Sequence, residues 1–251
     1  MLIVCWDYDG TLVSSELIYK NIFVNYLSKN GYVIKNIDND YYFTKYAGKH
    51  PFTVLEQLKK DGYVDKNTEI NVDELNLIFQ KELSKSDDLL LTDGIVDVLK
   101  DITKHKNTFM AIVTSTYRID FEAKFNNPGV KELKQFFDVD KNVYICGEVG
   151  TKQLKPNPNG YIFAYEDIVK KFNLKNDKKD CFVMVEDSIS GCKSGSNAKE
   201  ILKDKVNCTV VGYIESNKFV SEENIKNAGA DVVIKTSKEL AKFMDSLIKN
   251  N

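Results

Sequence analysis

The sequence predicts an α/β fold, in which helices cover a parallel β-sheet and an α-helical insert follows the first strand. Two observations predict it: short apolar runs alternate with segments of helical periodicity, and one interval between successive runs is far longer than the others. The 251 residues suffice for one core domain with a large insert, but not for two full domains and a linker. With 43% hydrophobic and 29% charged residues the chain can bury a sizeable core, which argues against disordered and fibrous classes.

Six short apolar runs, rich in β-branched residues, are each expected to form a buried strand. They occupy residues 2–6, 109–113, 143–146, 181–185, 209–213 and 231–234. Residues 95–102, 160–172 and 238–248 show helical periodicity instead. Because helices between strands allow parallel pairing, these segments predict a Rossmann-like parallel sheet covered by helices.

The first and second apolar runs are separated by about 100 residues, far more than the roughly ten to fifteen of an ordinary crossover helix. Helical patterns dominate this interval: Ile18, Ile22 and Tyr26 share one face of a helix, and glycines punctuate the segments. We therefore expect an α-helical cap domain at residues 15–90 and an α/β core formed by residues 1–14 and 91–251. A cap inserted in this way leaves a cleft beside the core, where ligands commonly bind.

Charge and cysteine content argue against several classes of function. The net charge of −2 and the pI near 5.8 provide no basic surface for nucleic acid. The apolar run at residues 2–6 is too short for a membrane span or a signal peptide, so we expect a cytoplasmic protein that binds no membrane. Five cysteines without a C-x-x-C pair argue against a disulfide framework and a cysteine-based zinc site. The sequence does not predict the oligomeric state.

Reactive side chains follow several of the predicted strands. Ligands bind open parallel sheets beyond the carboxyl ends of the strands, so these positions carry the most information. Asp7 and Asp9 follow the first strand, on the same side of an extended chain, and precede Gly10. Two such acids can bind a divalent cation and divide nucleophilic and acid-base roles between them. The alternative is an Asp-rich turn, which is common for the Asp-Gly pair alone.

Three further segments carry polar groups. Thr114 ends the second strand, although a threonine there is ordinary by itself. Lys155 precedes a Pro-x-Pro sequence, which is expected to present its ammonium group rigidly. Glu186 and Asp187 close the fourth strand and favour a cation site, while Ser188 can cap the helix that follows.

These segments together resemble the haloacid dehalogenase superfamily, in particular its phosphatase and β-phosphoglucomutase-like branch. Residues 7–16 (DYDGTLVSSE) resemble the first motif, residues 111–116 (AIVTST) the second, residues 155–158 (KPNP) the third and residues 183–188 (VMVEDS) the fourth. The resemblance covers nearly the whole chain. It implies an α-helical cap directly after the first motif, which agrees with the insert expected from the spacing of the strands.

The resemblance implies a Mg²⁺-dependent phosphatase that hydrolyses a small phosphorylated metabolite, such as a sugar phosphate or phosphoglycolate, through an aspartyl-phosphate. Asp7 is then the nucleophile and Asp9 the general acid and base, while Thr114 and Lys155 bind the phosphoryl oxygens. The implied metal ligands are Asp7, Asp9 through its backbone carbonyl, Asp187, and Glu186 either directly or through water.

Further substrate contacts are expected from four residues. Ser115 follows Thr114 at the end of the second strand. Lys49 and His50 belong to a segment, residues 46–50, that resembles the cap loop facing the active site in this family; a solvated helix turn is the alternative. Arg118 is the only arginine of a lysine-rich chain. Its guanidinium is expected to make a bidentate contact, either to substrate or to a structural carboxylate.

Two other functions remain open. A β-phosphoglucomutase-like sugar phosphomutase shares all four motifs, but that branch usually has a histidine at the entry to the cap, where this sequence has residues 16–19 (ELIY). A catalytically inactive binding or regulatory protein could keep the same scaffold; against it, no catalytic group is missing. Dehalogenases are disfavoured because they lack an acid at the position of Asp9, since halide leaves without a proton.

Overall fold

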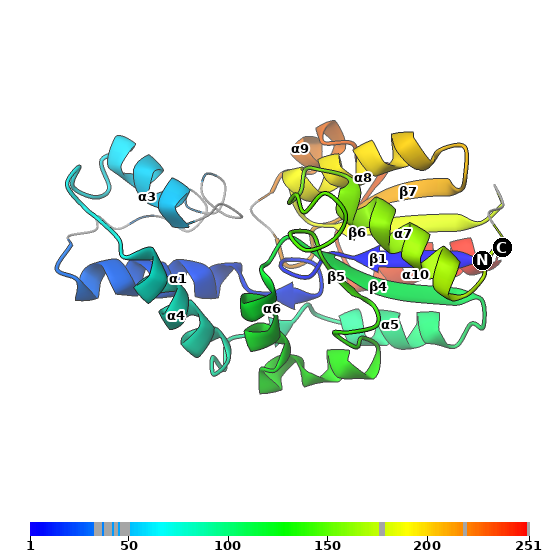
Figure 1. Cartoon of the computed structure of the whole chain (residues 1–251), viewed down its shortest axis with the longest axis horizontal. Coiled ribbons are helices and arrows are strands. Elements are labelled where there is room, and N and C mark those ends of the chain that lie inside the picture. Colours follow the sequence, from blue (N-terminus) through cyan, green and yellow to red (C-terminus); the bar gives the residue numbers. More distant parts are fainter. Residues whose placement is uncertain are drawn as a thin grey trace. The chain divides into compact units, whose positions relative to one another are not determined.

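The computed structural model describes residues 1–32, 37, 42, 45, 51–175, 179–217 and 220–249. Helices and strands alternate along most of the chain (Figure 1). No described helix is long and apolar enough to cross a lipid bilayer. The strands are β1 (Leu2–Trp6), β2 (Val13–Ser14), β3 (Leu90–Leu91), β4 (Thr108–Thr114), β5 (Val143–Ile145), β6 (Cys181–Glu186), β7 (Asn207–Tyr213) and β8 (Val232–Ile234). The helices are α1 (Glu16–Lys29), α3 (Pro51–Lys60), α4 (Val72–Leu83), α5 (Ile95–Thr103), α6 (Arg118–Phe125), the 3₁₀ helix η1 (Pro128–Gln135), α7 (Asn159–Lys171), α8 (Ile189–Leu202), α9 (Glu222–Asn227) and α10 (Ser237–Lys249).

Six strands form one parallel sheet in the order β5-β4-β1-β6-β7-β8. Each of the six apolar runs forms one of these strands, so the predicted Rossmann-like α/β sheet is confirmed. β1 lies inside the sheet, where Trp6 pairs with Ile112 of β4 and with Val185 of β6. The carboxyl ends of these three strands therefore meet at one edge of the sheet, and the residues that follow them come together.

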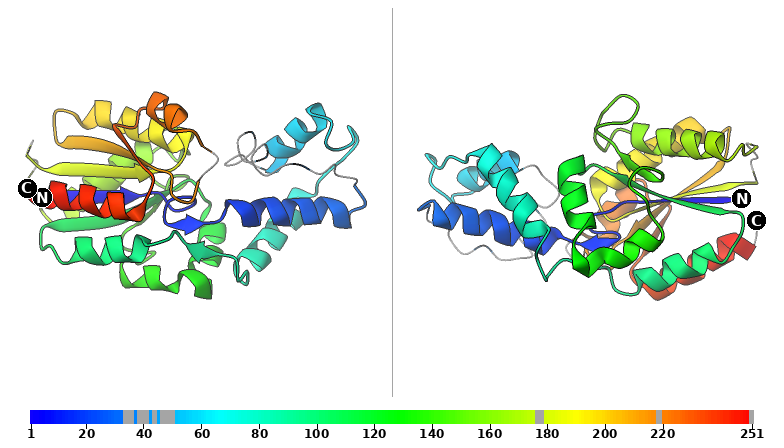
Figure 2. Two further views of the ribbon diagram at one scale, coloured as in Figure 1. Left: turned by 180° about the vertical axis from the view of Figure 1, so that it is seen from behind. Right: turned by 60° about the horizontal axis from the view of Figure 1, so that its bottom comes forward.

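Helices cover both faces of the sheet. α7 and α8 pack on one face, and α5 and α10 lie on the other (Figure 2). Alternate residues of β1, such as Ile3 and Cys5, join a buried cluster that includes Tyr165 of α7 and Ala198 of α8. Because both faces are covered, every residue of β1 is buried, which explains its unbroken apolar run.

The described chain divides into two compact units. Unit 1 contains Met1–Ser14, Leu91–Arg118 and Lys131–Asn251, and unit 2 contains Ser15–Leu90 and Ile119–Val130. β2 and β3, which pair in a separate two-stranded sheet, stand where the chain passes from unit 1 to unit 2 and back. The expected boundaries differ from this division by one segment, Ile119–Val130, because the sequence analysis assigns residues 91–251 to the core.

Packing explains why this segment belongs to unit 2. Phe121 of α6 is fully buried. Asn127 donates its side-chain N–H groups to the backbone carbonyls of Leu83 and Ser86, at 2.9 and 3.0 Å, where α4 ends. Gly129 lies so close to the segment after α4 that a Cβ at this position would be 2.1 Å from the carbonyl oxygen of Leu89. The sequence of α6 does not indicate which unit covers its buried residues.

Candidate active site

Lys155 contacts residues at the carboxyl ends of β1, β4 and β6. Its Nζ lies 2.5 Å from Oδ1 of Asp7 and 2.7 Å from Oε1 of Glu186, and it donates to the carbonyl oxygen of Val113 at 2.7 Å. An ammonium group has three N–H donors, so these three acceptors satisfy it. The backbone N–H of Lys155 donates to Oγ of Ser115 at 3.1 Å. Ser115, which the sequence analysis assigns to substrate binding, thus holds the backbone of the lysine.

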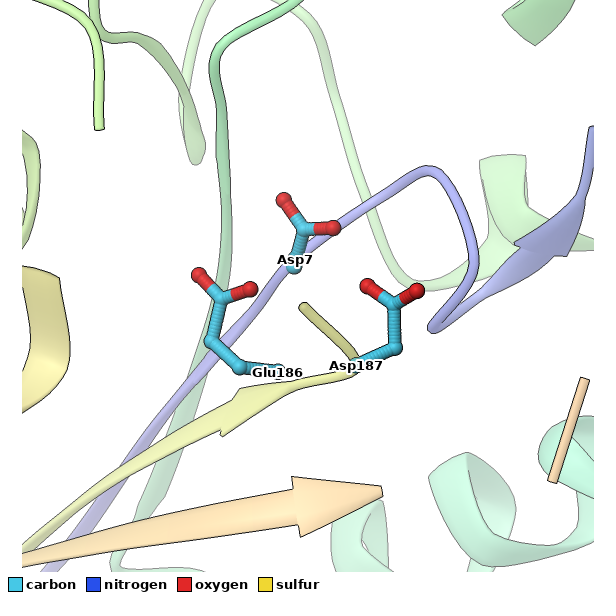
Figure 3. Close-up of side chains that lie close together, drawn as sticks. All are labelled: Asp7, Glu186 and Asp187. Atoms are coloured by element: carbon cyan, nitrogen blue, oxygen red, sulfur yellow. The ribbon is translucent and has the colours of Figure 1, made fainter. Parts of the chain in front are cut away.

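Three carboxylates gather beside this lysine. Asp7, Glu186 and Asp187 each offer one oxygen atom, and these atoms lie within 4.8 Å of one another (Figure 3). Carboxylate oxygens are ligands that Mg²⁺ and Ca²⁺ prefer in proteins. Oε2 of Glu186 is buried and has no hydrogen-bond partner among the residues that the structure describes. A buried oxygen of this kind calls for a water or an ion, so the three residues fit a divalent cation.

Two glycines give these carboxylates their space. Gly10 has a φ of +81°, and a Cβ there would lie 2.0 Å from Oδ2 of Asp187. A Cβ at Gly191, in the first turn of α8, would lie 1.7 Å from Oε2 of Glu186. Real Cβ atoms do not come within 3.0 Å of another heavy atom in this way. The backbone therefore approaches both acids only because glycine has no side chain.

Asp9 is not part of the three-carboxylate cluster. Its Oδ2 accepts a hydrogen bond from the hydroxyl of Thr116 at 2.6 Å. The hydroxyl oxygen of Thr114, which is buried at the end of β4, accepts the backbone N–H of Thr116 at 3.1 Å. The hydroxyl of Thr114 therefore stabilises the turn after β4, and Thr116 in this turn binds Asp9.

Burial dominates the electrostatics of the cluster. It raises the pKa of the Asp7 carboxyl above its ordinary value, although the neighbouring Lys155 ammonium acts in the opposite direction. Burial also raises the pKa of Glu186, again against the effect of Lys155. For Lys155 itself, burial alone would lower the pKa, but the charges of Asp7 and Glu186 raise it above the ordinary value. The lysine therefore stays protonated and carries the positive charge of the site.

The remaining predicted substrate contacts lie elsewhere. Arg118 makes a bidentate contact with Glu148: its Nε lies 2.8 Å and its Nη2 2.6 Å from Oε2, and Nε lies 3.1 Å from Oε1. Both side chains are 40% exposed. Of the two partners that the sequence leaves open for Arg118, the structure records the carboxylate. Lys49 and His50 lie outside the described residues.

Three residues that the sequence analysis above does not assign to the site also touch it. Thr116 binds Asp9, as described above, and the hydroxyl of Tyr161 donates to Oε1 of Glu186. Asn217 donates its side-chain N–H to Oδ2 of Asp187 at 2.7 Å. Asn217 follows the end of β7, so the rule that ligands gather beyond strand ends could have found it. No sequence signal distinguishes Tyr161 from Tyr165, the other tyrosine of α7.

The sequence matches a family model over residues 4–200; that model describes the haloacid dehalogenase-like hydrolases. No curated protein matches the chain.

Solved structures resemble this one over nearly its whole length. A haloacid dehalogenase family hydrolase from Deinococcus radiodurans, with bound phosphate and sodium, has a TM-score of 0.71 at 19% identity, covering 98% of this chain and 95% of its own. A candidate β-phosphoglucomutase from Thermotoga maritima has a TM-score of 0.67 at 19% identity, with coverage of 98% and 99%. A CbbY variant from Rhodobacter sphaeroides, in complex with xylulose-(1,5)-bisphosphate, has a TM-score of 0.61 at 18% identity and covers 92% of each chain. At such identities the likeness establishes a shared fold.

Proposed function

Because the chain belongs to the family of haloacid dehalogenase-like hydrolases, we propose that it is a Mg²⁺-dependent phosphatase of a small phosphorylated metabolite. The observation that carries the proposal is the Lys155 ammonium between Asp7 and Glu186, beside the three-carboxylate cluster. Phosphoryl transfer needs positioned charge more than it needs reactive groups, and this cluster supplies both signs of charge in a buried place. The Deinococcus radiodurans hydrolase of the same fold contains phosphate.

In the proposed first step, a carboxylate oxygen of Asp7 attacks phosphorus and the ester P–O bond breaks, which leaves an aspartyl-phosphate. The departing oxygen takes a proton from the Asp9 carboxyl group, so the product alcohol leaves neutral. Lys155 orients the Asp7 carboxylate through Oδ1. Thr114 and Lys155 are proposed to bind the phosphoryl oxygens, with a phosphoryl oxygen taking the place of one of the three acceptors of the Lys155 ammonium.

In the proposed second step, Asp9 is ionised and takes a proton from water. The water oxygen attacks phosphorus, the bond between phosphorus and Asp7 breaks, and inorganic phosphate leaves. Thr116 holds Oδ2 of Asp9 at 2.6 Å and so keeps this carboxylate in place for both proton transfers. When bound by Asp7, Glu186, Asp187 and the backbone carbonyl of Asp9, Mg²⁺ offsets the negative charge of the transferring group.

The part of the substrate beyond the phosphoryl group is proposed to contact Ser115, Arg118, Lys49 and His50. Ser115 and Arg118 both have protein partners, the backbone of Lys155 and the carboxylate of Glu148. We therefore expect Ser115 and Arg118 to contribute little to substrate affinity, and Lys49 and His50 stay proposed substrate contacts.

A phosphomutase is the second candidate function. One observation favours it: the Thermotoga maritima structure of the same fold is a candidate β-phosphoglucomutase. Residues 16–19 (ELIY), where that branch usually has a histidine, disfavour it. A mutase returns the phosphoryl group to a sugar, whereas a phosphatase releases inorganic phosphate, so the products distinguish the two.

The test is hydrolysis of p-nitrophenyl phosphate and of a panel of sugar phosphates, phosphoglycolate and nucleoside monophosphates, with Mg²⁺ and with a chelator. We expect Mg²⁺-dependent release of inorganic phosphate from at least one panel member, and loss of this activity in Asp7→Asn. Conversion of one sugar phosphate isomer into another, without phosphate release, would favour the mutase. Complete inactivity across the panel would favour a binding protein and contradict the proposal.

A further inference from the structure

Tyr161 connects the catalytic cluster to α7. The side chain is fully buried, and its hydroxyl donates to Oε1 of Glu186. The same oxygen atom is 2.7 Å from Nζ of Lys155, and that Nζ lies 5.2 Å from the centre of the Tyr161 ring. Tyr161 therefore contacts both partners of the buried ion pair, one through its hydroxyl and the other through its ring.

Packing alone does not explain the hydroxyl. A phenylalanine would fill the same volume, and burying a hydroxyl costs free energy unless it forms a hydrogen bond. Tyr165, one turn further along α7, is also buried, but its ring packs on Phe182 with centroids 5.3 Å apart. Both tyrosines are buried on the same helix, and it is the hydroxyl of Tyr161 that donates to Glu186.

Glu186 has one oxygen that is held and one that is not. Oε1 receives both Lys155 and Tyr161, whereas Oε2 has no partner among the described residues and lies against Gly191. The last torsion of a glutamate side chain is broad, so the carboxylate plane is fixed only by what binds it. With the tyrosine hydroxyl removed, Lys155 would be the one side-chain donor left to this carboxylate among the residues that the structure describes.

We propose that Tyr161 is a positioning residue: by holding Oε1 of Glu186, it sets the orientation in which this carboxylate joins Asp7 and Asp187 around a divalent cation. The inference rests on the proposed function only in taking Mg²⁺ as that cation. Groups that orient metal ligands in this way typically change metal affinity or activity by about 10- to 100-fold when they are removed.

The test compares Tyr161→Phe with Tyr165→Phe, a matched substitution on the same helix. Mg²⁺ affinity is measured by isothermal titration calorimetry without substrate, and kcat and KM are measured on p-nitrophenyl phosphate at saturating Mg²⁺. We expect Tyr161→Phe to weaken Mg²⁺ binding about 10-fold or more and to lower kcat with little change in KM. Tyr165→Phe should stay within about twofold of the unmodified protein in each quantity, because its ring packing is retained.

A second pair of variants tests whether Tyr161 acts through Glu186. In the background of Glu186→Gln, adding Tyr161→Phe should change Mg²⁺ affinity less than about twofold, because the group that the tyrosine positions has lost its charge. An equal effect of Tyr161→Phe with and without Glu186→Gln would overturn the proposal, as would unchanged Mg²⁺ affinity in the single variant or absence of Mg²⁺ binding in the unmodified protein. Normal Mg²⁺ binding together with inactivity on every phosphate ester would instead contradict the proposed function. The Mg²⁺ affinities of the Tyr161→Phe variants would then still test the role of Tyr161.

Discussion

The cluster around Lys155 in unit 1 and the contacts of Asn127 in unit 2 bury polar groups in opposite ways. Lys155, Asp7 and Glu186 bring one positive and two negative charges into the interior. Asn127 brings a neutral amide, whose N–H groups bind two backbone carbonyls and whose oxygen accepts the N–H of Gly129 at 2.8 Å. The amide of Asn127 is satisfied by uncharged partners, whereas the Lys155 cluster has to overcome the cost of removing charges from water and leaves Oε2 of Glu186 without a partner among the described residues.

The cost of burying charges indicates whether the Lys155 cluster and the Asn127 contacts have a functional or a structural role. Replacing a buried ion pair by apolar residues is often neutral or stabilising, so a buried charge cluster is poor evidence of stability. A buried amide that binds backbone carbonyls costs far less and fixes how two chain segments pack. We therefore interpret the Lys155 cluster as chemical in purpose and the Asn127 contacts as structural, and the two should respond differently to substitution.

Lys155→Met should have the largest effect. It leaves Asp7 and Glu186 buried without their cation, which we expect to cost about 3–5 kcal/mol in the free energy of unfolding and to remove the proposed phosphatase activity. The two carboxyl groups have pKa values raised by burial, so the folded state binds more protons than the unfolded state. Stability of the variant should therefore fall as pH rises through the unfolded and then the folded pKa values, and the loss should be smallest in acid.

Urea unfolding at several pH values, beside an activity assay, measures both parts of this expectation. Lys131→Met, at an exposed lysine, is the matched control and should change stability by less than about 0.5 kcal/mol. A cluster whose purpose is structural would lose stability at Lys155→Met while keeping its activity.

Asn127→Ala should have the next largest effect, and within unit 2. The carbonyls of Leu83 and Ser86 would each lose a donor, and we expect a cost of about 2–4 kcal/mol. Amide hydrogen exchange should quicken at the end of α4 and in α6, while the strands of unit 1 keep their protection. Unchanged exchange in α4 would show that the Asn127 contacts do not hold the segment in place.

The same contrast shows how far sequence reasoning reaches. Asp7, Glu186 and Asp187 could be placed because each lies within two residues of the end of an apolar run, and parallel strands bring their ends to one edge. Lys155 is far from them in sequence, and its prolines suggested a fixed position but not its partners. The partners of Lys155 depend on how the helices pack on the sheet, and the periodicity of apolar residues does not specify that packing. For the same reason the sequence could not place Tyr161 beside Glu186, or α6 in unit 2.

Gly191→Ala tests the distinction between metal-site and structural contacts within a single helix, α8. Its Cβ would lie 1.7 Å from Oε2 of Glu186, so the carboxylate has to move. We expect a destabilisation of about 1–3 kcal/mol and weaker Mg²⁺ binding. Gly195→Ala, also in α8, would bring a Cβ only to 3.2 Å from methyl groups of Val210. Because alanine has a higher helix propensity than glycine, we expect part of the free-energy cost of this close contact to be offset. Thermal melting and calorimetry of the two variants should differ accordingly; equal Mg²⁺ affinity in both would mean that the space at Gly191 does not serve the metal site.

Arg118→Lys should have the smallest effect. The ion pair between Arg118 and Glu148 is 40% exposed on both sides, and exposed pairs contribute up to about 1 kcal/mol because water and salt screen them. Lysine keeps the charge but loses the bidentate geometry, so we expect a loss below about 1 kcal/mol and a KM within about twofold of the original. Glu148→Gln should produce a similar loss, since it breaks the same pair. If Arg118→Lys raised KM strongly while Glu148→Gln did not, Arg118 would act on substrate, and recognition would extend from the buried charges around Lys155 to an exposed one.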